Sequence, residues 1–158
     1  MRTVMLSQLA EWCEGRLIGE DITVSRIGTD SRENLAGALF VALRGERFDA
    51  HDFAPQAGDH GAAALLLHRP VSTDLPHILC PDTEEALGEI AAGLAAGRRS
   101  VVLALTGSNG KTSVKTLLYA IMRNAGRAYA NPGNRNNEIG LPLAVIDAPE
   151  DAEFAIYE

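Results

Sequence analysis

Hydrophobic positions in the first half of the chain fall into short runs that glycines and polar turns separate. The run at residues 39–43 is continuous and bounded by glycines, which is typical of a buried strand. Ser7 is predicted to cap a short helix that ends at Gly15. Asp52 is predicted to cap a second helix, over residues 53–57. The expected strands are 16–19, 22–27, 39–43, 63–67 and 77–80, the first two joined by a turn at Asp21.

The pattern changes in the second half of the chain. Asp82 is predicted to cap a long helix whose apolar residues share one face. Residues 101–105 form a fully apolar run, predicted to be a buried strand, that leads through a glycine-rich turn into a helix over residues 112–124. Strand, loop and helix in that order are half of a parallel α/β unit. Further strands are expected at 127–130 and 153–157, with a helix that includes 141–145.

These elements predict an α/β protein with two domains. We place a small α/β domain at residues 1–81 and the start of a parallel-sheet domain at residues 82–158. The chain stops at Glu158, directly after a strand, whereas a parallel sheet needs a crossover helix after each strand. We therefore expect the second domain to be truncated and the chain to be a fragment of a longer protein.

Composition and charge narrow the range of partners. Hydrophobic residues make up 46% of the 158 residues and the formal net charge is −7, so we expect no nucleic-acid binding. Cys13 and Cys80 fit neither a disulfide framework nor a zinc site, and the four histidines show no metal-ligand spacing. The N-terminus lacks the pattern of a signal peptide, and the longest apolar run, residues 62–67, is too short to cross a membrane. We expect a soluble cytoplasmic protein.

The glycine-rich turn after residue 105 carries the strongest candidate chemistry. Its glycines allow successive backbone N–H groups to point into one concavity, where they can donate to a phosphate. The positive N-terminal dipole of the following helix also favours phosphate binding. Lys111 is expected to reach the β- and γ-phosphates of a nucleotide, and the Thr112 hydroxyl to bind Mg²⁺. The alternative is a tight turn with an exposed lysine. The predicted nucleotide-binding residues are Gly107, Ser108, Asn109, Gly110, Lys111, Thr112 and Ser113.

Glu158 is a second candidate at the same edge of the predicted sheet. It ends a strand expected to run parallel to residues 101–105, and the carboxyl ends of such strands face the ligand crevice. Its carboxylate is therefore a candidate Mg²⁺ ligand in the intact protein. The alternative is a solvated terminal acid, and we expect Glu158 to be disordered at the end of this chain.

Four segments resemble the Mur ligase and folylpolyglutamate synthase superfamily, and together they span essentially the whole chain. Residues 105–112 form the shorter Gly-x-x-Gly-Lys-Thr phosphate loop of that superfamily. Residues 29–32, 39–53 and 133–142 narrow the resemblance to one type of Mur ligase. The resemblance implies a UDP-binding N-terminal domain followed by the beginning of a central ATPase domain. A glutamate after a short apolar strand binds Mg²⁺ in this family, and residues 154–158 match that pattern.

The resemblance also implies an activity. It is that of a ligase that uses ATP and Mg²⁺ to join D-alanyl-D-alanine to UDP-N-acetylmuramoyl-tripeptide through an acyl phosphate, in peptidoglycan precursor synthesis. Lys111 and Glu158 would be its catalytic residues in this chain, the enzyme is expected to be a monomer, and the fragment alone is expected to be inactive. The alternatives are the related ligase that adds the third peptide residue and a standalone UDP-sugar or nucleotide-binding module without catalysis.

The implied substrate contacts lie in three loops. The first follows the strand at 22–27, and the second follows the buried strand at 39–43. The third is an asparagine-rich turn, which the resemblance places beside the reacting carboxylate. Each loop has a plain alternative as a set of turn-forming, helix-capping or solvated residues. The predicted substrate-binding residues are Asp30, Ser31, Arg32, Arg47, Asp49, His51, Asn134, Asn136 and Asn137.

Overall fold

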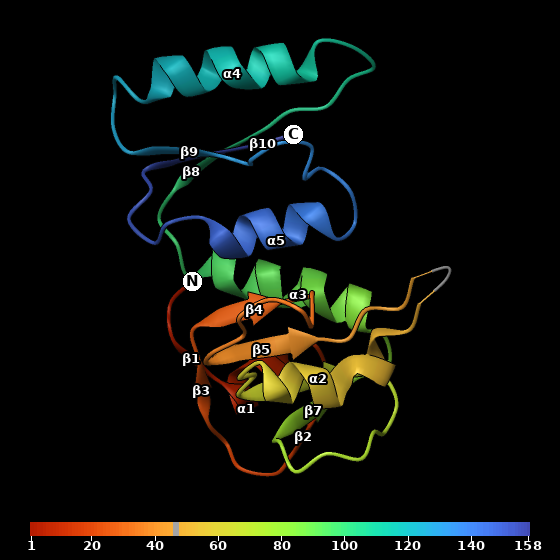
Figure 1. Cartoon of the computed structure of the whole chain (residues 1–158). Helices are drawn as coiled ribbons and strands as arrows, with labels where there is room; N and C mark the ends of the chain where they lie inside the picture. The colour runs from red at the N-terminus through yellow and green to blue at the C-terminus, as the bar shows by residue number, and fades with distance from the viewer. Residues whose placement is uncertain (46–47) are drawn as a thin grey trace. The chain divides into compact units, whose positions relative to one another are not determined.

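The computed structural model of the chain describes residues 1–45 and 48–158, and these form two compact units (Figure 1). The first unit comprises Arg2–Ile90, and the second comprises Ala91–Glu158 together with Met1. The division falls within a single helix, α3 (Thr83–Ala96). The two compact units thus divide after Ile90, whereas the predicted domains divide after residue 81, shortly before α3 begins.

A five-stranded sheet forms the centre of the first unit. In its order β2-β7-β6-β5-β4, the strands β4 to β7 run parallel to their neighbours, and β2 pairs antiparallel with β7 at one edge. Both β5 and β6 are buried along their whole lengths, as expected for central strands of a mostly parallel sheet. The bounds are β2 (Arg16–Ile18), β4 (Arg26–Gly28), β5 (Ala38–Val41), β6 (Ala64–Leu67) and β7 (His77–Leu79), with a separate pair of β1 (Val4–Met5) and β3 (Thr23–Val24).

Two local predictions near the N-terminus are wrong. Ser7 does not cap a helix, because it lies inside α1 (Leu6–Trp12), where its backbone N–H donates to the Asp21 carboxylate at 2.9 Å. The strand expected at 22–27 is split into β3 and β4, which pair with β1 and β5 and not with β2. The single expected strand is thus divided between two different partner strands, since cross-strand pairing and packing decide where a strand ends.

The hydrophobic core of the first unit joins the sheet to two short helical segments, η1 (Ala50–Phe53) and α2 (Ala54–Asp59). The helix predicted over residues 53–57 is present, but the chain enters it through η1. The side chain of Asp49, and not that of Asp52, accepts the backbone N–H of His51 at the start of η1. The buried residues of this core are Leu35, Ala38, Phe40, Ala42, Ala54, Ala57, Ala62, Leu65 and Leu67.

Three parallel strands form the sheet of the second unit, in the order β8-β10-β9. Figure 1 shows α4 on one face of this sheet and α5 on the other. Ala144 of α5 belongs to one buried cluster with Ala155 and Tyr157 of β10. The predicted parallel α/β arrangement is therefore confirmed. The bounds are β8 (Val101–Ala104), α4 (Lys111–Met122), β9 (Ala128–Ala130), α5 (Gly140–Asp147) and β10 (Phe154–Tyr157).

The strand at residues 101–105 is less buried than its apolar pattern predicts. Val101 and Val102 expose 57% and 58% of their surface, and Leu117 on α4 exposes 63%. Because β8 lies at the edge of the sheet, no strand among residues 1–45 and 48–158 covers its outer side. The strand is present, but its predicted burial is wrong for the described part of the chain.

Among the described residues, none of the helices is long and apolar enough to span a membrane.

The start of α3 provides a test of helix capping. The predicted cap is confirmed, because Asp82 accepts the backbone N–H groups of Glu84 at 2.7 Å and of Glu85 at 3.0 Å. Loss of such a cap costs about 1 kcal/mol, so Asp82→Ala should speed hydrogen exchange at these two N–H groups by about fivefold. Asp74→Ala, which removes an exposed acid from the same unit, is the control. Unchanged exchange in Asp82→Ala would show that the carboxylate does not stabilise the helix start.

Candidate functional site

A pocket of about 730 Å³ opens at the carboxyl edge of the first sheet. Its walls come from the loop after β4 and the segment after β5, two parallel neighbours whose ends lie side by side. The volume is typical of a small-molecule site, and the wall combines aromatic side chains with hydroxyl, amide and charged groups. The apolar part of the wall consists of Phe40, Leu43, Phe48, Ala50 and Phe53.

The first predicted substrate loop forms the polar part of the pocket wall. Arg32 makes a bidentate ion pair with Asp30, at 2.8 and 2.6 Å, and its backbone N–H donates to the same carboxylate at 3.0 Å. These contacts hold the pKa of Asp30 at about 2, so the carboxylate is ionised at neutral pH. The Ser31 hydroxyl donates to Gln56 Oε1 at 3.2 Å, whereas 79% of the Arg32 side chain is exposed. The fold therefore brings the three predicted residues of this loop together at the pocket.

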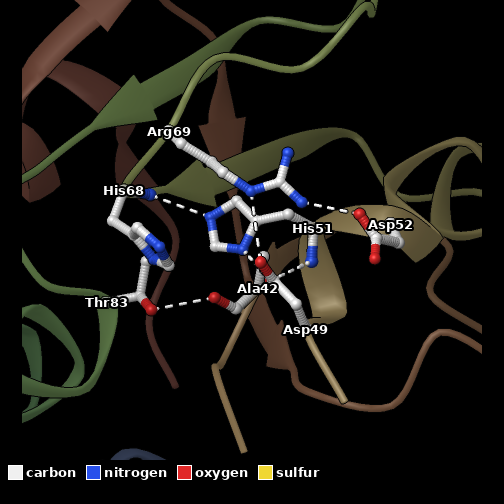
Figure 2. Close-up of polar contacts among 7 residues, drawn as sticks. All are labelled: Ala42, Asp49, His51, Asp52, His68, Arg69 and Thr83. Carbon is white, nitrogen blue, oxygen red and sulfur yellow. Dashed lines mark hydrogen bonds and ion pairs between the residues drawn. The ribbon is translucent and has the colours of Figure 1, made fainter.

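The second predicted loop contributes differently from the first. Arg47 lies outside the described residues. Neither Asp49 nor His51 is among the described residues that line the pocket. Figure 2 shows that both turn toward the end of β6, where they meet residues that follow that strand. We call this group the His51 cluster; it consists of Asp49, His51, Asp52, His68 and Arg69.

The ring of His51 is fully enclosed in this cluster, with its side chain 0% exposed. Its Nδ1 lies 2.6 Å from Asp49 Oδ1, and its Nε2 accepts the backbone N–H of His68 at 3.0 Å. A backbone N–H can only donate, so Nε2 carries the lone pair and Nδ1 the proton. Burial lowers the pKa of His51, which favours this neutral form. Both ring nitrogens are thus engaged within the protein, and the substrate contact of His51 stays a prediction.

The cluster also has the composition of a metal site. Asp49, His51 and His68 each offer one ligand atom, and these atoms lie within 4.8 Å of one another. However, Arg69 Nε donates to Asp49 at 3.1 Å, so a cation already neutralises this carboxylate. Burial alone would raise the pKa of Asp49, but hydrogen bonds from His51 and Arg69 outweigh it and hold the value at about 2. The geometry fits an ion-pair network better than a metal centre.

The glycine-rich loop of the second unit connects β8 to α4, as the sequence predicts. Gly110 has a φ of 77°, a left-handed conformation that suits glycine, and it directly precedes the first helical residue. The Lys111 ammonium donates to the Gly107 carbonyl at 2.7 Å, so the side chain folds back over the loop. Residues 107–110 are exposed, which leaves the positive N-terminus of α4 open to an anion.

Glu158 lies beside this loop, at the carboxyl end of β10. The Thr112 hydroxyl is 3.3 Å from each Glu158 carboxylate oxygen, so the two predicted Mg²⁺ ligands face each other. Lys115 forms an ion pair with the same carboxylate at 3.1 Å and holds the pKa of Glu158 below its ordinary value. The backbone N–H of Glu158 also donates to Asn131 Oδ1 at 3.1 Å. The expectation that Glu158 is disordered is therefore wrong, because side chains from two other segments hold it.

Two buried polar residues of this site escape the sequence prediction. Lys115 has a side chain that is 7% exposed, and its ammonium donates to the carbonyls of Asn131 at 3.2 Å and Gly133 at 3.1 Å. Asn131 is 2% exposed and accepts the backbone N–H of Glu158. A sequence signal exists for Lys115 alone, since it lies one helical turn after Lys111 and thus on the same face of α4.

The three asparagines of the asparagine-rich turn make different contacts. The sequence left open whether they contact substrate or form the turn and the helix start. Asn136 Nδ2 donates to Glu158 at 3.3 Å and so belongs to the site. Asn137 Oδ1 accepts the backbone N–H of Gly140, the first residue of α5, at 2.7 Å. Asn134 is exposed, and its carbonyl accepts the backbone N–H of Asn136 at 2.9 Å. The structure thus brings one of the three predicted side chains to the carboxylate of Glu158.

Comparison with known proteins finds two matching family models. A model described as the Mur ligase middle domain matches residues 105–158, and one described as the Mur ligase family catalytic domain matches residues 23–94. The UDP-N-acetylmuramoyl-tripeptide–D-alanyl-D-alanine ligase of Escherichia coli (strain K12) is 47% identical over 158 residues, which are 100% of this chain and 35% of that protein. The ligase of the same name from Bacillus subtilis (strain 168) is 38% identical, over 99% of this chain and 35% of that protein.

Solved structures agree with these similarities. A crystal structure of MurF from Acinetobacter baumannii superposes with a TM-score of 0.94 at 31% identity, over 100% of this chain and 36% of that one. MurF ligase from Thermotoga maritima in complex with ADP gives a TM-score of 0.79 at 33% identity, over 84% of this chain and 31% of that one. The chain thus spans about a third of the length of the curated relatives that it matches.

The protonation of His51 can be tested by NMR. The lowered pKa means that the unfolded chain, with an ordinary histidine pKa of about 6.5, binds a proton more readily than the folded one. The stability contributed by His51 should therefore be complete above about pH 6.5 and be lost as the pH falls further. Long-range ¹H–¹⁵N spectra at pH 7 should show a neutral ring with the proton on Nδ1. A ring that is protonated on both nitrogens at that pH would contradict the assignment.

Proposed function

Because the chain belongs to the Mur ligase family, we propose that it supplies two binding sites of an ATP-dependent amide-forming ligase. The reaction joins D-alanyl-D-alanine to UDP-N-acetylmuramoyl-tripeptide, in the cytoplasmic synthesis of peptidoglycan precursors. The observation that carries this proposal is the 47% identity to a ligase of that name along all 158 residues, through both sites. The pocket of the first unit and the phosphate loop of the second then serve one reaction.

The pocket of the first unit is suited to the uridine diphosphate part of this substrate. Phe48 and Phe53, which are 72% and 41% exposed, offer apolar ring faces against which a uracil ring can stack. The exposed guanidinium of Arg32 offers donors for the diphosphate, and Asp30 fixes its orientation. Ser31 and Gln56 add hydroxyl and amide groups that can hydrogen-bond a polar ring edge.

The phosphate loop of the second unit is suited to the phosphates of ATP. When bound, ATP supplies the phosphoryl group that activates the substrate carboxylate. The Lys111 ammonium would exchange the Gly107 carbonyl for phosphate oxygens and neutralise their charge. Residues Thr112 and Glu158 fit Mg²⁺, which prefers hydroxyl and carboxylate oxygens, and they already lie 3.3 Å apart. The Thermotoga maritima relative was solved in complex with ADP, which supports nucleotide binding in this proposal.

Lys115 keeps the carboxylate of Glu158 in place in this proposal. It links Glu158 to the carbonyls of Asn131 and Gly133, and so ties α4, β10 and the loop after β9 together. An electrostatic site works best when its charges are fixed before the reaction begins. Lys115 therefore contributes by positioning, whereas Lys111 contributes by direct contact with phosphate.

The alternative ligase, which adds the third peptide residue, has less support. A structure titled as the 2,6-diaminopimelate ligase superposes with a TM-score of 0.63, but its 21% identity indicates a shared fold alone. We expect the intact protein to form amide product from UDP-N-acetylmuramoyl-tripeptide, D-alanyl-D-alanine and ATP. Chromatography of the products would show this, with UDP-N-acetylmuramoyl-dipeptide plus diaminopimelate as the competing pair. Product from the second pair alone would favour the alternative, and nucleotide binding without any product would favour a standalone module.

Lys111 is the residue whose removal tests the phosphate loop. A contact that strengthens in the transition state lowers kcat when it is lost, so Lys111→Ala should reduce kcat roughly a thousandfold. Lys111→Arg should recover little, because a planar guanidinium cannot replace a compact ammonium. The control is Arg99→Ala, an exposed cation at the other end of β8. Steady-state kinetics on the intact enzyme give the answer, and a folded Lys111→Ala enzyme with near-normal kcat would mean that the loop is structural.

A further inference from the structure

The segment after β5 presents two sets of residues to two different neighbours. Phe48, Ala50 and Phe53 line the pocket, whereas Asp49 and the residues at 51–52 contact the end of β6. A contact that holds the residues facing β6 therefore also restricts the movement of the pocket-lining residues, because both belong to one short stretch of backbone. The His51 cluster thus lies behind the pocket wall.

The side chain of Arg69 links the residues after β6 to two points of η1. Figure 2 shows its guanidinium reaching from the end of β6 to two separate carboxylates. Its Nε donates to Asp49 at 3.1 Å, and its terminal nitrogen donates to Asp52 at 2.6 Å. Asp49 caps the start of η1 and Asp52 lies within it, so one side chain contacts both the start and the interior of the helical turn that carries Ala50. This arrangement resists both translation and rotation of η1.

The other contacts of the segment after β5 hold η1 at points different from Asp52. The ring of His51 is held by Asp49 and by the backbone of His68, so it anchors one point of η1. The backbone N–H of Ala50 donates to the Leu43 carbonyl at 3.0 Å, which closes the base of the loop. Within residues 1–45 and 48–158, the side chain of Asp52 makes an ion pair with Arg69 at 2.6 Å. Loss of Arg69 therefore releases the end of η1 next to Phe53.

We propose that Arg69 is a positioning residue for substrate binding, which holds η1 so that the aromatic wall of the pocket is formed before the ligand arrives. The inference rests on the proposed function, because the ligand it concerns is the UDP part of the substrate. A loop that must be ordered by its ligand lowers the apparent affinity, whereas a loop that is already ordered does not. Arg69 acts through the loop and does not itself line the pocket.

An arginine is required by this geometry. Its planar fork offers donors in two directions, whereas a lysine ammonium is a single point that can serve one carboxylate well. The Arg69 side chain is 42% exposed, and exposed ion pairs contribute little to global stability. A variant should therefore stay folded while the loop loosens. This separates a positioning role from a general structural one.

The test compares Arg69→Gln and Arg69→Lys in the intact protein with Arg16→Gln as the control. Arg16 is an exposed arginine on β2, at the far edge of the same sheet from β4. Arg69→Gln should raise the Kd and KM for UDP-N-acetylmuramoyl-tripeptide about tenfold, with kcat, the KM for ATP and the melting temperature unchanged. Arg69→Lys should recover part of this loss, and Arg16→Gln should resemble the wild type.

Hydrogen exchange at the Ala54 N–H, which donates to the His51 carbonyl at the end of η1, gives a second readout that needs no ligand. It should rise about tenfold in Arg69→Gln and stay unchanged in Arg16→Gln. Unchanged exchange and affinity in Arg69→Gln would overturn the inference, as would full recovery by lysine or a parallel loss of kcat and ATP affinity. A wild-type protein that binds no UDP ligand would instead refute the proposed function, and faster exchange in Arg69→Gln would then still support the role of Arg69 in holding η1.

Discussion

In both units the strands that precede the functional loops run parallel, so every such loop leaves from the same edge of its sheet. In the first unit this edge gathers the loop after β4, the segment after β5 and the residues after β6. In the second unit it places Thr112, which follows β8, against Glu158 at the end of β10. Side chains far apart in sequence thus become neighbours without any special local geometry.

The parts of the structure that depend on local signals could be predicted from the sequence. The apolar run before a Gly-Lys-Thr turn identifies a strand, loop and helix, and Asp82 marks the start of α3. Contacts that depend on pairing between distant strands could not be predicted. Nothing near Asp21 in the sequence indicates that its carboxylate accepts the N–H of Ser7, because the contact arises only once β3 has paired with β1.

The candidate site shows the same division. Residues of the phosphate loop share a contiguous motif, and Glu158 follows from the expected parallel register with β8. Lys115 and Asn131 are different, since their importance comes from burial and from contacts that the fold creates. His51 was predicted through its neighbours in a loop motif, but a motif does not reveal which way a side chain turns. Its ring points into the protein, where both nitrogens find partners.

The acidic character of the chain has to be reconciled with a proposed anionic substrate. A net charge of −7 would repel a nucleotide sugar if the carboxylates near the sites were unpaired. Three of these carboxylates instead have a cation beside them: Asp30 has Arg32, Asp49 has Arg69, and Glu158 has Lys115. Pairing lowers the pKa of all three carboxyl groups and at the same time cancels their local field. These three acids thus orient cations without repelling the ligand, and the exposed guanidinium of Arg32 remains available to it.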